Sequence, residues 1–177
     1  FMSDDSMFYI GAGTYVKEDI LFDEINTTGV KDRIFIDYNT GVITDDHIAR
    51  EKVSKHLTDK IGSTCSGSGQ AGVDRVLRQL KVAKDYLSLN NITTDVSAEL
   101  NDIINKGGSV LVEGSQATFL SVYHGTYPYT TSKDVCASAM LSDVGIGPTK
   151  VKEVIIVFKS FVTRVGEISE KENHHPD

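Results

Sequence analysis

Two short apolar runs constrain the fold of this chain more than any other feature: VLV at residues 110–112 and VIIVF at residues 154–158. Turn-forming residues bound each run, and a long, polar, glycine-rich connection separates them. Apolar runs of this kind, joined by a long crossover, are typical of buried parallel strands. The sequence therefore predicts an α/β fold with a mostly parallel sheet flanked by helices.

A group of polar residues follows the first run. In open α/β sheets, ligands bind beyond the carboxyl ends of the strands. The polar residues in that position are Gln116, His124, Thr126, Tyr127, Thr130, Thr131, Ser132 and Lys133. We therefore expect a site for a polar ligand in this stretch.

Length and charge exclude several classes of function. The 177 residues suffice for one domain with its own core. The net charge of −7 disfavours broad nucleic-acid binding, because such binding needs a basic face. The sequence has no apolar run of about eighteen residues, so we expect no membrane span, and its start does not resemble a secretory signal. A cytoplasmic protein is the expectation.

The two cysteines, Cys65 and Cys136, belong to no CxxC motif. This pattern indicates free thiols in a reducing compartment, with a Cys65–Cys136 disulfide as the alternative. No metal-ligand pattern stands out in the sequence. The adjacent His174 and His175 fit a solvated tail better than a ligand pair.

The first part of the chain predicts alternating strands and helices. A strand is expected at residues 7–10, followed by a tight turn at GAG before a helix. The third glycine of GxGxxG is missing there, because Val16 occupies its place. Helical spacing covers residues 15–25, β-rich alternation covers 33–38, and a helix start is expected at 44–46. We expect that last helix to carry Ile48, Val53 and Leu57, and we assign no role to His47 or His56.

The stretch IGSTCSGSGQ at residues 61–70 has two interpretations. Its composition is that of a flexible linker. Alternatively, its backbone N–H groups and hydroxyls converge on a phosphate, with the N-terminus of the next helix adding favourable charge. It is not a Walker A loop, because GxxxxGK[ST] is absent.

The rest of the chain predicts two further helices, a small-residue helix and a strand. Residues 71–87 form a helix whose apolar stripe consists of Val73, Val76, Leu77, Leu80, Ala83 and Leu87. Arg78 then lies opposite that stripe with Arg75 and Lys81, as on a solvated basic face. Helices are also expected at 96–104 and 136–142, and a long strand at 153–163.

Three stretches carry a resemblance to a known family. The run EGSQATFLSVYHGTYPYTTSKD resembles the segment of adenylosuccinate synthetases that holds the purine nucleotide, and DVGIGPTKVKEVIIVFKSFVTRVG resembles its continuation. The 61–70 stretch is similar to that family's phosphate loop, but Cys65, Gln70 and Gly72 depart from its usual residues. The chain is identified as similar to the short archaeal-type branch. The resemblance covers residues 1–166 but only the central portion of a family member.

This resemblance implies an incomplete P-loop-like ligase fold. Residues 1–166 would be the central part of a single α/β domain, and residues 167–177 a polar tail or junction. The family joins IMP and L-aspartate in a GTP-dependent reaction, using Mg²⁺ and acting as a homodimer. The resemblance gives IMP-binding roles to Thr64, Gln116 and Thr131, and to Arg78 from the neighbouring subunit. Local loop bonding is the alternative for Gln116 and Thr131.

No catalytic residue and no metal ligand is assigned in this chain. The family's GDEGKG-like loop, its NAGH-like segment and its C-terminal regions have no match here, so we expect the chain to be inactive alone. Two other functions stay open. One is the viral relative that uses dGMP in place of IMP. The other is a non-catalytic fragment that binds a nucleotide or only dimerises.

Overall fold

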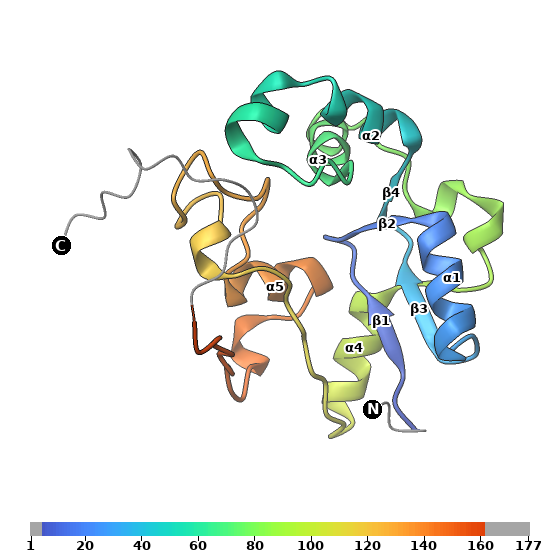
Figure 1. Cartoon of the computed structure of the whole chain (residues 1–177). Helices are drawn as coiled ribbons and strands as arrows, with labels where there is room; N and C mark the ends of the chain where they lie inside the picture. Colours follow the sequence, from blue (N-terminus) through green and yellow to red (C-terminus); the bar gives the residue numbers. More distant parts are fainter. Residues whose placement is uncertain (1–4, 162–177) are drawn as a thin grey trace.

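A parallel three-stranded sheet lies at the centre of the structure, a computed structural model that describes residues 5–161 (Figure 1). The sheet has the order β1-β3-β5, from strands β1 (Phe8–Ile10), β3 (Ile34–Asp37) and β5 (Thr93–Thr94). Helix α1 (Glu18–Thr28) lies on one side of it and α4 (Val96–Asn105) on the other. This arrangement confirms the predicted α/β class.

Strand alternation divides the core into two clusters. Ile10 and Ile36 face α1, whereas Tyr9 faces α4 and stacks on Phe35 with ring centroids 5.7 Å apart. The buried members of the α1 cluster are Leu21, Ile25, Ile36, Val42, Ala83 and Leu89. Those of the α4 cluster are Val96, Leu100 and Ile146. Each cluster therefore fixes one helix on one face of the sheet.

A second, two-stranded parallel sheet corrects one prediction. Strand β2 (Tyr15–Lys17) pairs with β4 (Gly41–Ile43), with Tyr15 opposite Gly41. The helix predicted to begin at Tyr15 begins at Glu18 instead, because residues 15–17 pair with β4 as strand β2. The sequence pattern did not predict β4, a strand of only three residues.

Helix α2 (Asp45–Lys52) begins where predicted. Thr44 precedes it in an extended conformation, and the side chains of Thr44 and His47 bond each other's backbone N–H groups in a capping box. Val53 is the residue at which α2 ends, and Leu57 belongs to the following π-helix η1 (His56–Ile61). The predicted placement of Val53 and Leu57 on α2 is therefore wrong.

Helix α3 is much shorter than the predicted helix 71–87. It spans Ser68–Val76, and Arg78 has a left-handed backbone with φ of 58°. The chain leaves the helix because the next residues bond to β4: Val42 N–H donates to Lys81 O, and Ala83 N–H donates to Thr40 O. The predicted apolar stripe is wrong as a core face, since Val73, Val76, Leu77 and Leu87 are exposed.

Short 3₁₀ turns connect the remaining elements. They are η2 (Ala83–Asp85), η3 (Leu87–Leu89), η4 (Thr118–Leu120) and η5 (Pro148–Lys150). The small-residue helix is confirmed as α5 (Ala137–Val144), which ends at Gly145 in a left-handed conformation. Helix α4 also confirms its prediction, with Asp95 accepting a hydrogen bond from the Ala98 N–H at its start.

The two strands predicted at 110–112 and 153–163 are wrong within the described residues. Val110 and Val112 pack against the α4 cluster without strand pairing, and residues 154–158 are exposed. A strand needs a neighbour to bond its backbone, and residues 5–161 offer these two runs none. In Figure 1 the segment around residue 155 lies apart from the central sheet. Residues 162–163, the tail 167–177, His174 and His175 lie outside the described residues.

Both cysteines are free thiols, as predicted. Among the described residues, no helix is long and apolar enough to cross a membrane.

Candidate nucleotide-binding site

The loop between η1 and α3 is held in an unusual backbone conformation. Gly62, Cys65 and Gly67 all have positive φ, at 69°, 51° and 89°. A residue with a Cβ costs roughly 1–2 kcal/mol in this conformation, so Cys65 stands where glycine is favoured. The structure therefore gives this loop one defined backbone conformation. Thr64 lies on it with an exposed side chain.

Glu51 of α2 fixes the end of this loop. Its side chain is buried, with the residue 3% exposed, and accepts hydrogen bonds from Gly67 N–H at 2.7 Å and Gln70 N–H at 3.1 Å. The carboxylate therefore occupies the N-terminus of α3, where negative charge is favoured. The N–H groups of Ser63 and Cys65 already donate to Leu57 O and Ser63 Oγ, so an external phosphate at this loop would use Thr64 and Ser66.

The sequence pattern did not single out Glu51. The available signal was its spacing of four residues from His47, which places both on one face of α2. Both are buried there.

A polar network joins α2 to α3. His47 accepts a hydrogen bond from Thr44 N–H at Nδ1, so its Nε2 carries the proton and donates to Asp74 at 3.1 Å. Arg50 donates two hydrogen bonds to the Asp74 carboxylate, at 3.0 and 2.7 Å. Arg50, and then His47, hold the pKa of Asp74 below its usual value against the effect of burial. The network positions α3 and needs no further role for His47.

Lys133 joins the polar stretch to the first turn of the chain. Its ammonium group donates to Gly13 O at 2.9 Å and to Asp143 of α5 at 2.5 Å. A Cβ on Gly13 would lie 1.9 Å from Asp143 Oδ1, and one on Gly11 would lie 2.6 Å from Asp143 O. The GAG turn thus has the structural role expected of it: its glycines let α5 approach.

A cavity of about 390 Å³ lies between α3 and the polar stretch. Its lining includes Gly69, Gly72 and Arg75 of α3, Tyr15 of β2 and Ser132. A Cβ on Gly69 would lie 3.9 Å from Ser132 Cβ, so the start of α3 and the 131–132 segment face each other closely. The structure thus brings the loop of Thr64 and the loop of Thr131 to one region.

The four predicted IMP-binding residues have distinct local settings. The Thr131 N–H donates to Leu120 O at 2.8 Å, and the residue is half-buried. Gln116 is exposed and has a φ of 78°. Arg78 is exposed, and its guanidinium donates to Val76 O at 3.0 Å. Within residues 5–161, no hydrogen bond joins any two of these four side chains.

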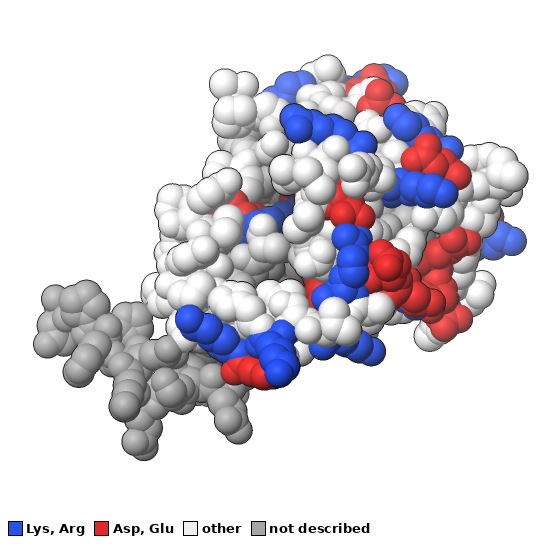
Figure 2. Space-filling view, turned by 90° about the horizontal axis from the view of Figure 1, so that it is seen from above, with Lys and Arg blue, Asp and Glu red and all other residues white. Residues whose placement is uncertain are grey.

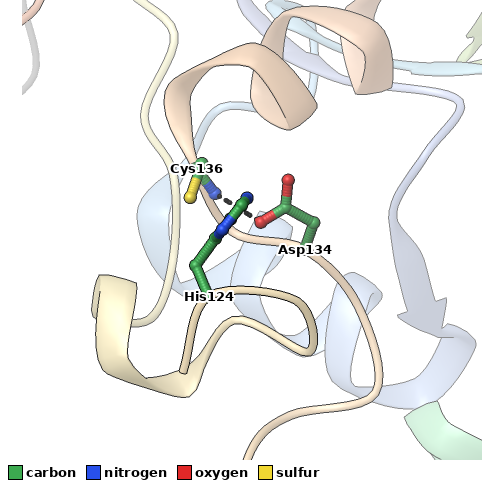
Figure 3. A group of neighbouring side chains, drawn as sticks. All are labelled: His124, Asp134 and Cys136. Atoms are coloured by element: carbon green, nitrogen blue, oxygen red, sulfur yellow. Dashed lines mark hydrogen bonds between the residues drawn. The ribbon is translucent and has the colours of Figure 1, made fainter. Parts of the chain in front are cut away.

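One group of described residues has the chemistry to hold a metal ion: His124, Asp134 and Cys136 (Figure 3). The Ser121 hydroxyl donates to Asp134 at 2.7 Å and holds the pKa of that carboxyl below its usual value. Burial, and then Asp134, raise the pKa of the Cys136 thiol. The sequence marked none of the three as a ligand, because their spacing matches no common motif.

The face seen in Figure 2 carries acidic and basic side chains beside one another. Its described part shows no continuous basic surface, in line with the acidic composition.

Comparison with known proteins decides the family. A family model described as adenylosuccinate synthetase matches residues 73–171, more than half of the chain. This chain belongs to the adenylosuccinate synthetase family. The adenylosuccinate synthetase of Methanocaldococcus jannaschii is 51% identical over 160 residues, covering 89% of this chain and 46% of that protein. That of Methanococcus aeolicus is 49% identical over 170 residues, covering 94% of this chain and 51% of that protein.

These archaeal adenylosuccinate synthetases confirm the predicted branch. The chain spans about half the length of the curated relatives it matches.

Solved structures of the family confirm the fold. The fully ligated adenylosuccinate synthetase of Plasmodium falciparum matches with a TM-score of 0.87 and 23% identity, covering 93% of this chain and 49% of that one. The succinoaminodeoxyadenylate synthetase of cyanophage S-2L, bound to dGMP and dATP, matches with a TM-score of 0.68 and 25% identity. That match covers 82% of this chain and 42% of the phage chain. The chain therefore superposes better on the Plasmodium falciparum structure than on the phage structure.

Proposed function

We propose that this chain is the IMP-binding portion of an adenylosuccinate synthetase. The whole protein joins IMP and L-aspartate at the expense of GTP, giving adenylosuccinate, GDP and phosphate in AMP biosynthesis, in the cytoplasm. The observation that carries the proposal is family membership together with about 50% identity to relatives of that name.

Different site residues bind different parts of the nucleotide. The Thr64 hydroxyl and the backbone N–H groups of Thr64 and Ser66 bind the IMP phosphate, and the Thr131 hydroxyl approaches it from the facing loop. The close approach of Gly69 and Ser132 supports this pairing. Gln116 bonds the purine or ribose, because an amide both donates and accepts hydrogen bonds.

Arg78 binds the phosphate of the IMP that is held by a second subunit. It is exposed, it directly follows α3, and the exposed side chains of Val76 and Leu77 precede it. An apolar surface beside an arginine fits contact with another copy of the chain in a homodimer. The buried carboxylate of Glu51 keeps the loop of Thr64 in place while that contact forms.

The Mg²⁺ of the reaction does not fit the one group of described residues that has metal-binding chemistry. Mg²⁺ prefers an octahedral set of oxygen ligands, whereas the metal-capable group here offers nitrogen, oxygen and sulfur. We therefore assign neither the Mg²⁺ ligands nor a catalytic base to this chain. Its own residues bind and orient IMP.

Titration calorimetry with IMP tests the proposal, using the intact natural protein that contains this chain. Thr64→Ala and Thr131→Ala should each weaken IMP binding roughly tenfold, because each removes a hydrogen bond to a charged group. Thr28→Ala, which removes an exposed hydroxyl bonded within α1, is the matched control. The proposal fails if IMP does not bind, or if the two site variants bind as tightly as the control.

A second candidate is the dGMP-dependent reaction of the viral type. The phage structure with dGMP supports it through a distant similarity alone, at 25% identity. Replacing IMP by dGMP in the same titration separates the two, since only one should bind strongly. Turnover with GTP and L-aspartate then separates a synthetase from a non-catalytic nucleotide-binding protein.

A further inference from the structure

The donor atoms of His124, Asp134 and Cys136 lie within 4.8 Å of one another. His124 lies beyond η4, whereas Asp134 and Cys136 directly precede α5. Figure 3 shows the imidazole between the thiol and the carboxylate. The group therefore spans the two arms of one long loop, residues 118–136.

A hydrogen-bond network fixes the positions of the three residues. Ser121 is fully buried. Its hydroxyl donates a hydrogen bond to Asp134 Oδ1 and accepts one from the backbone N–H of His124 at 3.1 Å. The Cys136 N–H also donates to Asp134 Oδ1, at 3.2 Å. The Cys136 thiol also bonds this carboxylate, so the thiol and the carboxylate already face each other. Groups that orient ligands in this way are a regular part of metal sites.

Backbone bonds hold the two arms together. Val122 N–H donates to Lys133 O at 3.2 Å, and Thr131 N–H donates to Leu120 O at 2.8 Å. The two arms are therefore placed side by side before any ligand binds.

The donor set selects the kind of metal. One imidazole nitrogen, one carboxylate oxygen and one sulfur suit Zn²⁺ and similar ions, whereas Mg²⁺ and Ca²⁺ prefer oxygen alone. In a tetrahedral zinc site, ligands about 2.0–2.3 Å from the metal lie roughly 3.3–3.8 Å apart. Donor atoms 4.8 Å apart would have to approach one another by about 1.0–1.5 Å, and the exposed His124 can supply this movement by rotation.

We propose that His124, Asp134 and Cys136 bind a thiolate-preferring divalent cation such as Zn²⁺. Binding releases the thiol proton to solvent and leaves the fourth coordination position to water. The bound ion cross-links the arms of the loop that carries Thr131. This site is independent of the Mg²⁺ and GTP of the proposed reaction.

Co²⁺ is the probe, added to the intact natural protein in excess Mg²⁺. A cobalt–thiolate bond produces a near-ultraviolet charge-transfer band that a site made only of oxygen and nitrogen cannot give. We expect the band to saturate at one equivalent, to persist in Cys65→Ser and to vanish in Cys136→Ser. Absence of the band in the folded protein, or its survival in Cys136→Ser, overturns the proposal.

A second pair of variants keeps the test independent of any folding defect at Cys136. His124→Asn changes an exposed side chain and should weaken Zn²⁺ binding at least tenfold, as measured by competition with a chromophoric chelator. His56→Asn, also exposed, should bind Zn²⁺ like the natural protein. Equal affinities in the two variants contradict the proposal. IMP titration of the same samples reports the nucleotide site separately.

Discussion

Glu51 accepts a 2.7 Å hydrogen bond from the backbone N–H of Gly67, sixteen residues further along the chain. The same carboxylate accepts a bond from Gln70 N–H. A buried acidic side chain of α2 therefore holds the end of the loop that precedes α3, and the shape of that loop depends on a residue outside it.

Glu51→Gln should destabilise the fold by about 2 kcal/mol, because the amide nitrogen cannot accept a hydrogen bond from a buried N–H. Urea unfolding measures the loss, and faster amide exchange at Gly67 and Gln70 localises it. Glu24→Gln, on the exposed part of α1, should change neither. If the two variants unfold alike, the carboxylate does not hold the loop.

Gly67 and Gly29 form a matched pair for backbone strain. Both have positive φ, but a Cβ on Gly29 meets nothing within 4 Å, whereas one on Gly67 would lie 2.7 Å from Ile43 Cγ2. Gly29→Ala should cost about 1 kcal/mol of stability from strain alone. Gly67→Ala should cost at least twice that in urea unfolding, since the clash adds to the strain. An equal loss of stability in the two variants would show that the loop shifts and relieves the clash.

The pair of Arg50 and Asp74 predicts a particular pH dependence. The folded-state pKa of Asp74 is lowered, chiefly by Arg50, so its contribution to stability is fully present above the unfolded-state pKa of about 3.9. It is lost as the pH falls through the folded-state pKa. Asp74→Asn should therefore be less stable than the natural protein at pH 6, and the gap should narrow in acid. The control is Asp102→Asn, which breaks only an exposed ion pair within α4. A gap constant from pH 6 to acid would contradict the role of the pair.

Lys133 should stabilise the contact between the first turn and α5. Lys133→Met removes the ammonium group from Gly13 O and leaves the Asp143 carboxylate, with only 17% of its side chain exposed, without this partner. We expect a loss of about 1–3 kcal/mol. In a double-mutant cycle, Asp143→Asn should cost less in the Lys133→Met background than alone. Strict additivity would mean that the two residues act separately.

The exposed end of α3 provides a test of the proposed homodimer. Leu77 is 56% exposed and lies beside Arg78. Leu77→Glu should weaken the homodimer at least tenfold in sedimentation analysis, because it places a charge in an apolar contact. Leu87→Glu alters a side chain that is 88% exposed outside this surface and should leave the dimer intact. A dimer unaffected by Leu77→Glu would place the contact elsewhere.

The sequence predicted best where local signals and packing agree. Helix α4 has a capping Asp95, a periodic apolar face and a glycine stop, and it lies within one residue of its predicted bounds. Helix α3 was overestimated because the periodic pattern continues through Leu80 to Ala83. There the chain bonds to β4 instead, and Ala83 enters the α1 cluster from a 3₁₀ turn.

The proposed site rests on the family resemblance, because composition alone left the 61–70 stretch open between a linker and a phosphate loop. The fold brings that loop and the polar stretch to α3. The clamp by Glu51 and the group of His124, Asp134 and Cys136 depend on contacts between segments distant in sequence. A search for local motifs has no means to find such contacts.

The exposed run at residues 154–158 has a consequence for handling the molecule. Its five apolar side chains are between 58% and 89% exposed, and they form a short segment rich in β-branched residues with no proline. Such segments pair edge to edge with their copies and seed fibrils. Lys152, Glu153 and Lys159 flank the run as charged gatekeepers. The 177-residue chain by itself, at high concentration, should therefore form β-rich aggregates. Aggregation should be faster at higher salt, because salt screens the flanking charges.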